Sequence, residues 1–227
     1  MGYFIVIILR NQRQKNDLYK AKILAEITTL ENERTRIAHD LHDEMGPILS
    51  SVKLRANNLD IHSPEDKEEL DKMNQNIDDM MQKMRAISND LMPVILQRKG
   101  LVAAMKDSLL RIGRPNGLEI VFSYEDIPEL PKNISIHLYR ILQEVIHNTI
   151  KHARAKELKI EMTRKNGKLV VISEDNGTGF DYNNHITENS GLGLRSLLSR
   201  VEIMGGEMFI ESKKGKGTQY IFEIPLP

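Results

Sequence analysis

Residues 143–153 have the sequence QEVIHNTIKHA, and most of them belong to a longer segment, 134–152, that has the period of a helix. Its buried face would carry Leu138, Ile141, Leu142, Val145 and Thr149. Glu144, Asn148 and Lys151 fall along one edge of that face. An asparagine in such a place is most often a surface or capping residue, but an amide oxygen also suits Mg²⁺ and a lysine suits phosphate. The strip is therefore a candidate site for a metal-bound phosphate.

Short runs of β-type residues lie on both sides of this helix. Strands are predicted over 118–124, 158–162, 169–174, 208–211 and 219–224, with further helices over 101–112 and 192–204. Asn166-Gly167 is a strong hairpin signal between two of these strands, and the segment 213–217, KKGKG, joins the last pair. Strands interleaved with helices predict a two-layer α/β sandwich, with helices on one face of a mixed sheet.

Two glycine-containing clusters follow predicted elements of this half. Residues 175–179, DNGTG, come directly after a strand, where they can form an ordinary turn or let Asp175 accept a hydrogen bond from an amine such as that of adenine. Residues 190–195, SGLGLR, open a helix, and glycines there expose N–H groups that favour phosphate. Neither cluster has the Rossmann or Walker spacing. Each is weak evidence alone, but their order and spacing together predict a nucleotide site.

The first half has the pattern of two long helices in a hairpin. One seam alternates steps of four and three residues with two polar interruptions, at Ile23, Ile27, Leu30, Arg34, Ile37, Leu41, Glu44, Ile48 and Val52. A second seam ends before Pro93 and contains Leu70, Met73, Ile77, Met80, Met84, Ile87 and Leu91. Between them, Ser63 and Pro64 suit the cap and the first position of a helix. A single hairpin would leave much of both seams exposed to solvent, so we expect a homodimer with a four-helix bundle.

Composition excludes several classes of function. The 227 residues contain 32 basic and 32 acidic side chains, and this zero net charge argues against direct nucleic-acid binding. The absence of cysteine removes disulfides, cysteine zinc sites and thiol chemistry.

The N-terminus carries an incomplete membrane signal. The apolar residues 3–9 are too few to span a bilayer, and Arg10, Arg13 and Lys15 follow them at once. This pattern fits the cytoplasmic end of a truncated transmembrane helix, which would hold the rest of the chain at the cytoplasmic side of a bacterial membrane. The alternatives are a short apolar tag and a helix end that packs on its own dimer mate.

Taken together, the polar clusters resemble those of the sensor histidine kinases of two-component signalling. The second half resembles the GHKL (Bergerat) ATP-binding fold shared with Hsp90, gyrase and MutL ATPases. The matching positions are Glu144, Asn148, Lys151 and His152; Asp175, Gly177 and Gly179; Gly191 and Gly193; and Gly217 with Thr218. The resemblance implies that ATP and Mg²⁺ are the cofactors, that Asn148 holds Mg²⁺ and that Asp175 contacts adenine. It also implies a mobile lid over residues 181–189.

Residues 33–43, ERTRIAHDLHD, resemble the phosphoacceptor signature of one subfamily, E-R-x-R-I-A-x-x-L-H-D. The resemblance implies that His42 takes the phosphoryl group from ATP, that Asp43 orients its imidazole or accepts its proton, and that an aspartate of a response regulator then receives the group. Such regulators usually carry a helix-turn-helix output domain. His39 occupies a variable position of the signature and is expected at the surface. Pro47 replaces the glutamine or histidine that often positions water in this subfamily, so we expect weak phosphatase activity or a different water-positioning group.

The expected class is therefore α+β, with four parts along the chain: 1–15, the membrane-proximal segment; 16–98, the dimerisation and phosphotransfer hairpin; 99–117, a linker helix; and 118–227, the ATP-binding domain. The expected catalytic residues are His42, Asp43 and Glu144. The alternatives are a GHKL ATPase, in which Glu144 would be the base for water, and a pseudokinase scaffold.

Overall fold

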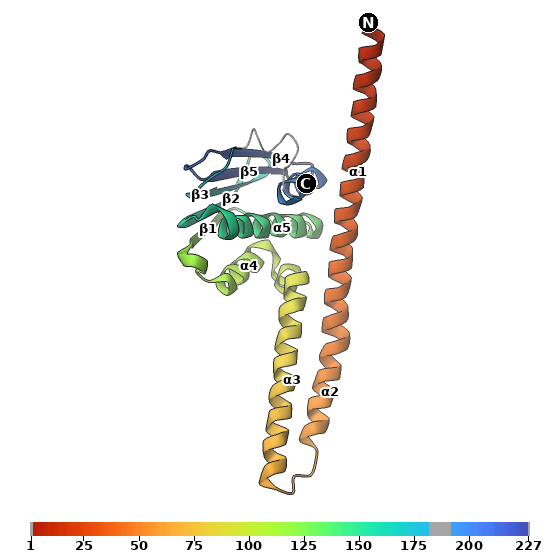
Figure 1. Cartoon of the computed structure of the whole chain (residues 1–227), viewed down its shortest axis with the longest axis vertical. Helices are drawn as coiled ribbons and strands as arrows, with labels where there is room; N and C mark the ends of the chain where they lie inside the picture. The colour runs from red at the N-terminus through yellow and green to blue at the C-terminus, as the bar shows by residue number, and fades with distance from the viewer. Residues whose placement is uncertain (1, 182–191, 227) are drawn as a thin grey trace. The chain divides into compact units, whose positions relative to one another are not determined.

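The computed structural model describes residues 2–181 and 192–226. The chain divides into two compact units, Thr28–Val94 and a second unit of Met1–Ile27 with Ile95–Pro227. Long helices come first and a mixed sheet with helices follows, so the predicted α+β class is confirmed (Figure 1).

The unit Thr28–Val94 is a helical hairpin. Helix α1 (Gly2–Asp40) enters it, a five-residue π-helical turn η1 (Leu41–Met45) follows, and α2 (Gly46–Asn57) continues to the connection with α3 (Pro64–Leu91). Ser63 caps α3 as predicted, because its Oγ accepts a hydrogen bond from the N–H of Asp66 at 3.0 Å. The Asp66 carboxylate in return accepts one from the N–H of His62 at 3.3 Å, one residue before the cap.

Polar side chains fix the pairing of the two arms, which lie side by side in Figure 1. Ser88 Oγ donates to the carbonyl of Ala38 at 3.1 Å, and Lys53 Nζ lies 2.6 Å from Asp78 Oδ1. Ala56 and Ile77 are buried, but much of the predicted seams is not: Ile48, Val52, Met73, Met80 and Ile87 stay exposed. One copy of the hairpin therefore leaves an apolar strip uncovered.

The N-terminal apolar run belongs to α1 in the structure. Within residues 2–181 and 192–226, no helix has the length and hydropathy to cross a membrane. A membrane-proximal role for residues 1–15 stays a prediction.

The second unit contains a five-stranded sheet in the order β1-β2-β3-β5-β4. The strands are β1 (Glu119–Glu125), β2 (Glu157–Lys165), β3 (Lys168–Asp175), β4 (Glu207–Ser212) and β5 (Thr218–Pro225). β1 pairs with β2 in parallel through an intervening helix, and the other pairs are antiparallel. Asn166 and Gly167 both have positive φ, 52° and 75°, as the predicted two-residue hairpin requires.

The helices of this unit are α4 (Val94–Ile112), α5 (Lys132–Asn148) and α7 (Leu192–Ile203), with a short 3₁₀ turn η2 (Pro115–Gly117). The helical residues 94–99 were not foreseen, and Gly100 separates them from the predicted helix at a φ of 78°. The prediction of one regular helix over 134–152 needs correction. The α-helix ends at Asn148, and residues 149–152 of the prediction belong to a second π-helical turn, η3 (Thr149–Ala153), which is followed by Arg154 in the left-handed region.

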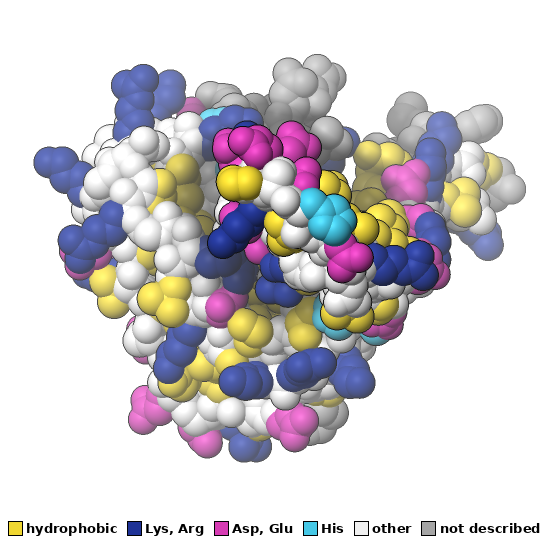
Figure 2. Space-filling model, turned by 90° about the horizontal axis from the view of Figure 1, so that it is seen from below, with side chains coloured by type: hydrophobic (Ala, Val, Ile, Leu, Met, Phe, Trp, Pro, Cys, Tyr) yellow, Lys and Arg dark blue, Asp and Glu magenta, His cyan; other side chains and the backbone are white. Residues whose placement is uncertain are grey.

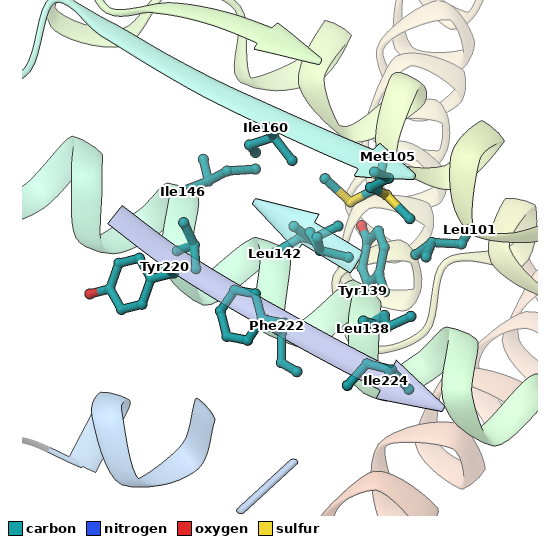
Figure 3. Close-up of a cluster of buried hydrophobic side chains, with 14 of the residues drawn as sticks. Leu101, Met105, Leu138, Tyr139, Leu142, Ile146, Ile160, Tyr220, Phe222 and Ile224 are labelled. Atoms are coloured by element: carbon teal, nitrogen blue, oxygen red, sulfur yellow. The ribbon is translucent and has the colours of Figure 1, made fainter. Parts of the chain in front are cut away.

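The core lies between the sheet and these helices. Figure 3 shows Leu101 and Met105 of α4, Leu138, Tyr139 and Leu142 of α5, and Phe222 and Ile224 of β5 packed together. Tyr220 lies at the end of this cluster, with its hydroxyl pointing away from it (Figure 3). The core therefore ends where the polar motifs begin.

On the face of the molecule in Figure 2, basic and acidic side chains are interspersed.

Candidate active site

The first wall of the site is the C-terminal turn of α5. Asn148 Nδ2 donates a hydrogen bond to Glu144 Oε1 at 3.1 Å, one helical turn earlier. This bond leaves the amide oxygen of Asn148 available to a cation. Thr149 Oγ1 donates to the carbonyl of Val145 at 3.0 Å and begins the π-helical turn that carries Lys151 and His152.

The second wall is the loop after β3. Asp175 is buried, and its Oδ1 accepts a hydrogen bond from the N–H of Gly177 at 2.8 Å. Burial raises the pKa of Asp175 above its ordinary value, against hydrogen bonds from the backbone of Gly177 and Thr218 that lower it. Asn176 Oδ1 accepts from the N–H of Lys156 at 2.9 Å and of Glu157 at 3.0 Å, which fixes the loop to the start of β2.

Two glycines are required by close backbone packing around this loop, and a third packs against a side chain that can move. A Cβ at Gly177 would collide with the carbonyl of Ala153, one at Gly179 with that of Lys213, and one at Gly193 with the carboxylate of Glu144. The start of α7 therefore lies directly against the acidic edge of α5.

The turn between β4 and β5 supports the same loop. Gly215 donates its N–H to the carbonyl of Thr178 at 2.6 Å, and Thr178 donates its own N–H to Ala153 at 2.7 Å. Ser212 Oγ lies 2.9 Å from Thr218 Oγ1 and accepts a hydrogen bond from the N–H of Phe180 at 2.8 Å.

These walls enclose a cavity of about 480 Å³. Of the predicted site residues, the cavity is lined by Glu144, Asn148, His152, Asp175, Gly179, Gly193 and Thr218. Lys151 is exposed on η3 and Gly177 packs against Ala153, so neither lines the cavity. Gly191 and lid residues 182–189 lie outside the described residues.

Sequence reasoning missed six further lining residues: Thr149, Ala153, Thr178, Phe180, Leu194 and Tyr220. Most are neighbours of motif residues in the chain. Tyr220 was recoverable from the two-residue period of a strand, since it follows Thr218 on the same face of β5. Burial first, and then the nearby carboxylates of Asp175 and Glu144, raise the pKa of Tyr220 to about 12, so its hydroxyl stays a neutral donor.

In the helical hairpin, η1 presents a second polar group. His42 Nδ1 lies 2.8 Å from Asp43 Oδ1, and His39 Nδ1 lies 3.4 Å from Asp43 Oδ2. All three side chains are more than half exposed. The hydrogen bond from His42, and then that from His39, hold the pKa of Asp43 below its ordinary value. In the neutral tautomer of His42 that donates Nδ1–H to Asp43, the lone pair of the ring lies on Nε2.

Comparison with known families matches both regions. The family described as "Histidine kinase" matches residues 33–96, which contain His42. The family described as "Histidine kinase-, DNA gyrase B-, and HSP90-like ATPase" matches residues 133–227, which contain the lined cavity. The chain belongs to the histidine kinase family.

Similar sequences agree with this assignment. This histidine kinase is 28% identical over 220 residues to the sensor protein VraS of Staphylococcus aureus, a match that covers 96% of the chain and 62% of VraS. The corresponding figure for VraS of Staphylococcus epidermidis is 27% over 220 residues. The chain thus spans about three fifths of the length of the curated relatives it matches.

Solved structures share its fold. The histidine kinase domain of a blue-light activated histidine kinase from Erythrobacter litoralis superposes with a TM-score of 0.53 at 19% identity, over 89% of this chain and 94% of that one. A longer structure of the same kinase gives a TM-score of 0.52 at 20% identity, over 81% of this chain and 60% of that one.

Proposed function

We propose that this chain phosphorylates its own His42 from MgATP and passes the phosphoryl group to an aspartate of a response regulator. The observation that carries the proposal is the 2.8 Å hydrogen bond between His42 Nδ1 and Asp43 Oδ1, because donation from Nδ1 puts the lone pair of a neutral imidazole on Nε2. A neutral imidazole held in this tautomer is a nucleophile at its Nε2 atom. Its exposure allows a nucleotide domain and a regulator to reach it in turn.

The cavity residues would bind the nucleotide. Asp175 would accept a hydrogen bond from the adenine amine at the buried end, and the neutral hydroxyl of Tyr220 adds a donor on the same side. The N-terminus of α7 would face the phosphates with its free N–H groups. The oxygens of Asn148 and Glu144 suit Mg²⁺, and the bound ion would neutralise charge on the transferred group.

The phosphoryl transfer itself asks little covalent work of the protein. His42 Nε2 attacks the γ-phosphorus, the bond to the β,γ-bridging oxygen breaks, and ADP leaves with that electron pair. The imidazole becomes cationic as the new P–N bond forms, and Asp43 stabilises that charge through Nδ1–H. Asp43 thus orients the imidazole and stabilises the positive charge that develops on it.

We also propose that the active form is a homodimer. The exposed strip of Ile48, Val52, Met73, Met80 and Ile87 follows the heptad spacing of a helix–helix interface. A second hairpin placed against it would complete a four-helix bundle. Membrane attachment and the helix-turn-helix output of the regulator are inferred from the sequence alone.

The test is incubation of the purified chain with Mg²⁺ and γ-labelled ATP, beside His42→Gln and the matched control His39→Gln. We expect label that survives base, is lost in acid, remains in His39→Gln and disappears in His42→Gln. Release of free phosphate without any labelled protein would contradict the kinase and favour an ATPase with Glu144 as base. Label that survives in His42→Gln but not in His39→Gln would move the acceptor to His39.

A further inference from the structure

A second cavity, of about 690 Å³, opens beside His42 within the helical hairpin. His42, Asp43, Pro47 and Ser50 line one side of it, and Arg85 and Asn89 of α3 line the other. Arg85 and Asn89 are one helical turn apart, so they lie on the same face of α3.

The packing of the two arms places these two residues level with His42. Ser88 is hydrogen-bonded to Ala38, four residues before His42. A Cβ on Gly46, four residues after His42, would lie 3.8 Å from the methyl carbon of Met84. Arg85 and Asn89 directly follow Met84 and Ser88, so they bracket the acceptor along the hairpin.

The other polar groups of the cavity are engaged. Ser50 Oγ donates to the carbonyl of Gly46 at 2.9 Å, Ser88 is held by Ala38, and Asp43 is shared by His42 and His39. Among residues 2–181 and 192–226, the structure gives Arg85 no carboxylate within 4.0 Å and Asn89 no side-chain hydrogen bond. A guanidinium and an amide are therefore available to a ligand next to His42.

A dimer interface over the apolar strip would leave this cavity open. Asn89 follows Met80 by nine residues, which is about two and a half turns of helix, so the two side chains point to opposite sides of α3. Arg85 is turned from Met80 by about 140°. The cavity and the apolar strip thus occupy different flanks of the hairpin.

We propose that Arg85 and Asn89 form a phosphoryl-binding site for phosphorylated His42. The inference rests on the proposed function, because it concerns the group that His42 would carry. The phosphoryl group on Nε2 has three acceptor oxygens and up to two negative charges, and a guanidinium matches two such oxygens at once. Arg85 supplies the charge and Asn89 a further donor, while Asp43 stays on the opposite nitrogen.

The test loads the full chain chemically and so does not depend on its kinase activity. Phosphoramidate transfers its phosphoryl group to imidazole nitrogen and releases ammonia, and the exposed His42 is open to it. The phosphohistidine-42 signal is identified in ³¹P NMR as the one missing from His42→Gln, and its pKa is followed by titration. A nearby cation favours the dianion, so we expect this pKa to rise by about 0.5 unit in Arg85→Gln.

Three variants make the outcome decisive. Arg85→Lys should give a pKa between those of the wild type and Arg85→Gln, because lysine keeps the charge but cannot make the bidentate contact. Asn89→Ala should raise the pKa by less than Arg85→Gln does. The exposed Arg55, later on α2, provides a control, since Arg55→Gln removes the same charge away from the cavity. Equal pKa values of phosphohistidine-42 in the wild type, Arg85→Gln and Arg55→Gln would overturn the proposal. It would also be overturned if Arg85→Gln changed only the rate of phosphoryl transfer to the regulator and not this pKa. Absence of labelling from ATP in the wild type would instead count against the kinase proposal alone.

Discussion

Asp43 is the residue on which two histidines converge. It accepts hydrogen bonds from His42 at 2.8 Å and His39 at 3.4 Å, and these lower its pKa. Because the folded-state pKa is depressed, the stabilisation from this carboxylate is present above the ordinary pKa of aspartate and is lost as the pH falls through the lowered value. The orientation of His42 therefore persists through the acidic range in which an ordinary aspartate would already protonate.

The two hydrogen bonds to Asp43 predict unequal effects of removing each histidine. His42→Gln should raise the pKa of Asp43 more than His39→Gln does, because the shorter bond from His42 is the larger cause of the shift. The measurement is a carbon-detected NMR titration of the Asp43 carboxyl group in the wild type and both variants. A larger rise in His39→Gln would show that His39 is the principal partner.

Two glycines in the turn between β4 and β5 allow the cost of backbone strain to be measured separately from the cost of steric collision. Gly215 and Gly217 have φ of 77° and 80°, but only at Gly217 would a Cβ collide with the carbonyl of Asp175. Gly215→Ala should lower the free energy of unfolding by about 1 kcal/mol, the ordinary cost of left-handed backbone in alanine. Gly217→Ala should cost about 3 kcal/mol or more, because the loop behind Asp175 must move as well. Urea unfolding of the two variants checks this, and equal losses would contradict it.

At the scale of elements, both π-helical turns carry residues predicted to be functional. The turn η1 holds His42 and Asp43, and η3 holds Lys151 and His152. A π-helical turn contains an extra residue, so it rotates every later side chain relative to a regular helix. It also explains why Lys151, placed with Glu144 and Asn148 by the regular helical period, does not line the cavity.

The local patterns were sufficient for most elements, and together with the family resemblance they predicted the seven residues that meet in the cavity. Hairpin turns, the cap at Ser63 and the apolar periods are local, and the structure has them where they were predicted. The contact of Gly193 with Glu144 and the support of Thr178 by Gly215 join segments far apart in the chain, so no local period reveals them. Arg85 and Asn89 were missed for the same reason, since only the pairing of the arms brings them to His42.

Pro47 is the element-scale feature with a functional consequence. It is the second residue of α2, after Gly46, and it lines the cavity beside His42 without offering a hydrogen-bonding side chain. Pro47→Gln should therefore increase dephosphorylation of the regulator by about tenfold, through an amide able to position water. Pro47→Ala introduces a backbone N–H but no side-chain amide, so it should leave the rate of regulator dephosphorylation unchanged. The measurement is loss of label from purified phosphorylated regulator, and an unchanged rate in Pro47→Gln would count against this interpretation.

At the scale of the whole molecule, the exposed apolar strip of the hairpin predicts an obligate partner copy. Val52 and Leu54 are 45% and 64% exposed and two residues apart, so they lie on opposite sides of α2. Val52→Glu would place a charge in the proposed interface and should convert the dimer to a monomer, with loss of hairpin stability. Leu54→Glu should leave the dimer intact. Light scattering coupled to size-exclusion chromatography distinguishes these outcomes, and a monomeric wild type would exclude the dimer.

The bonds that connect the loop after β3 with its neighbours have a consequence for how the unliganded protein moves. Thr178 donates to Ala153 and accepts from Gly215, while Asn176 holds the start of β2, so three chain segments are joined at one point. A proton on the Thr178 or Gly215 amide can exchange with water only when these segments separate together. The loop after β3, which forms the second wall of the cavity, should thus be among the slowest-exchanging parts of the second unit before a nucleotide binds. Nucleotide binding would then not have to order this wall.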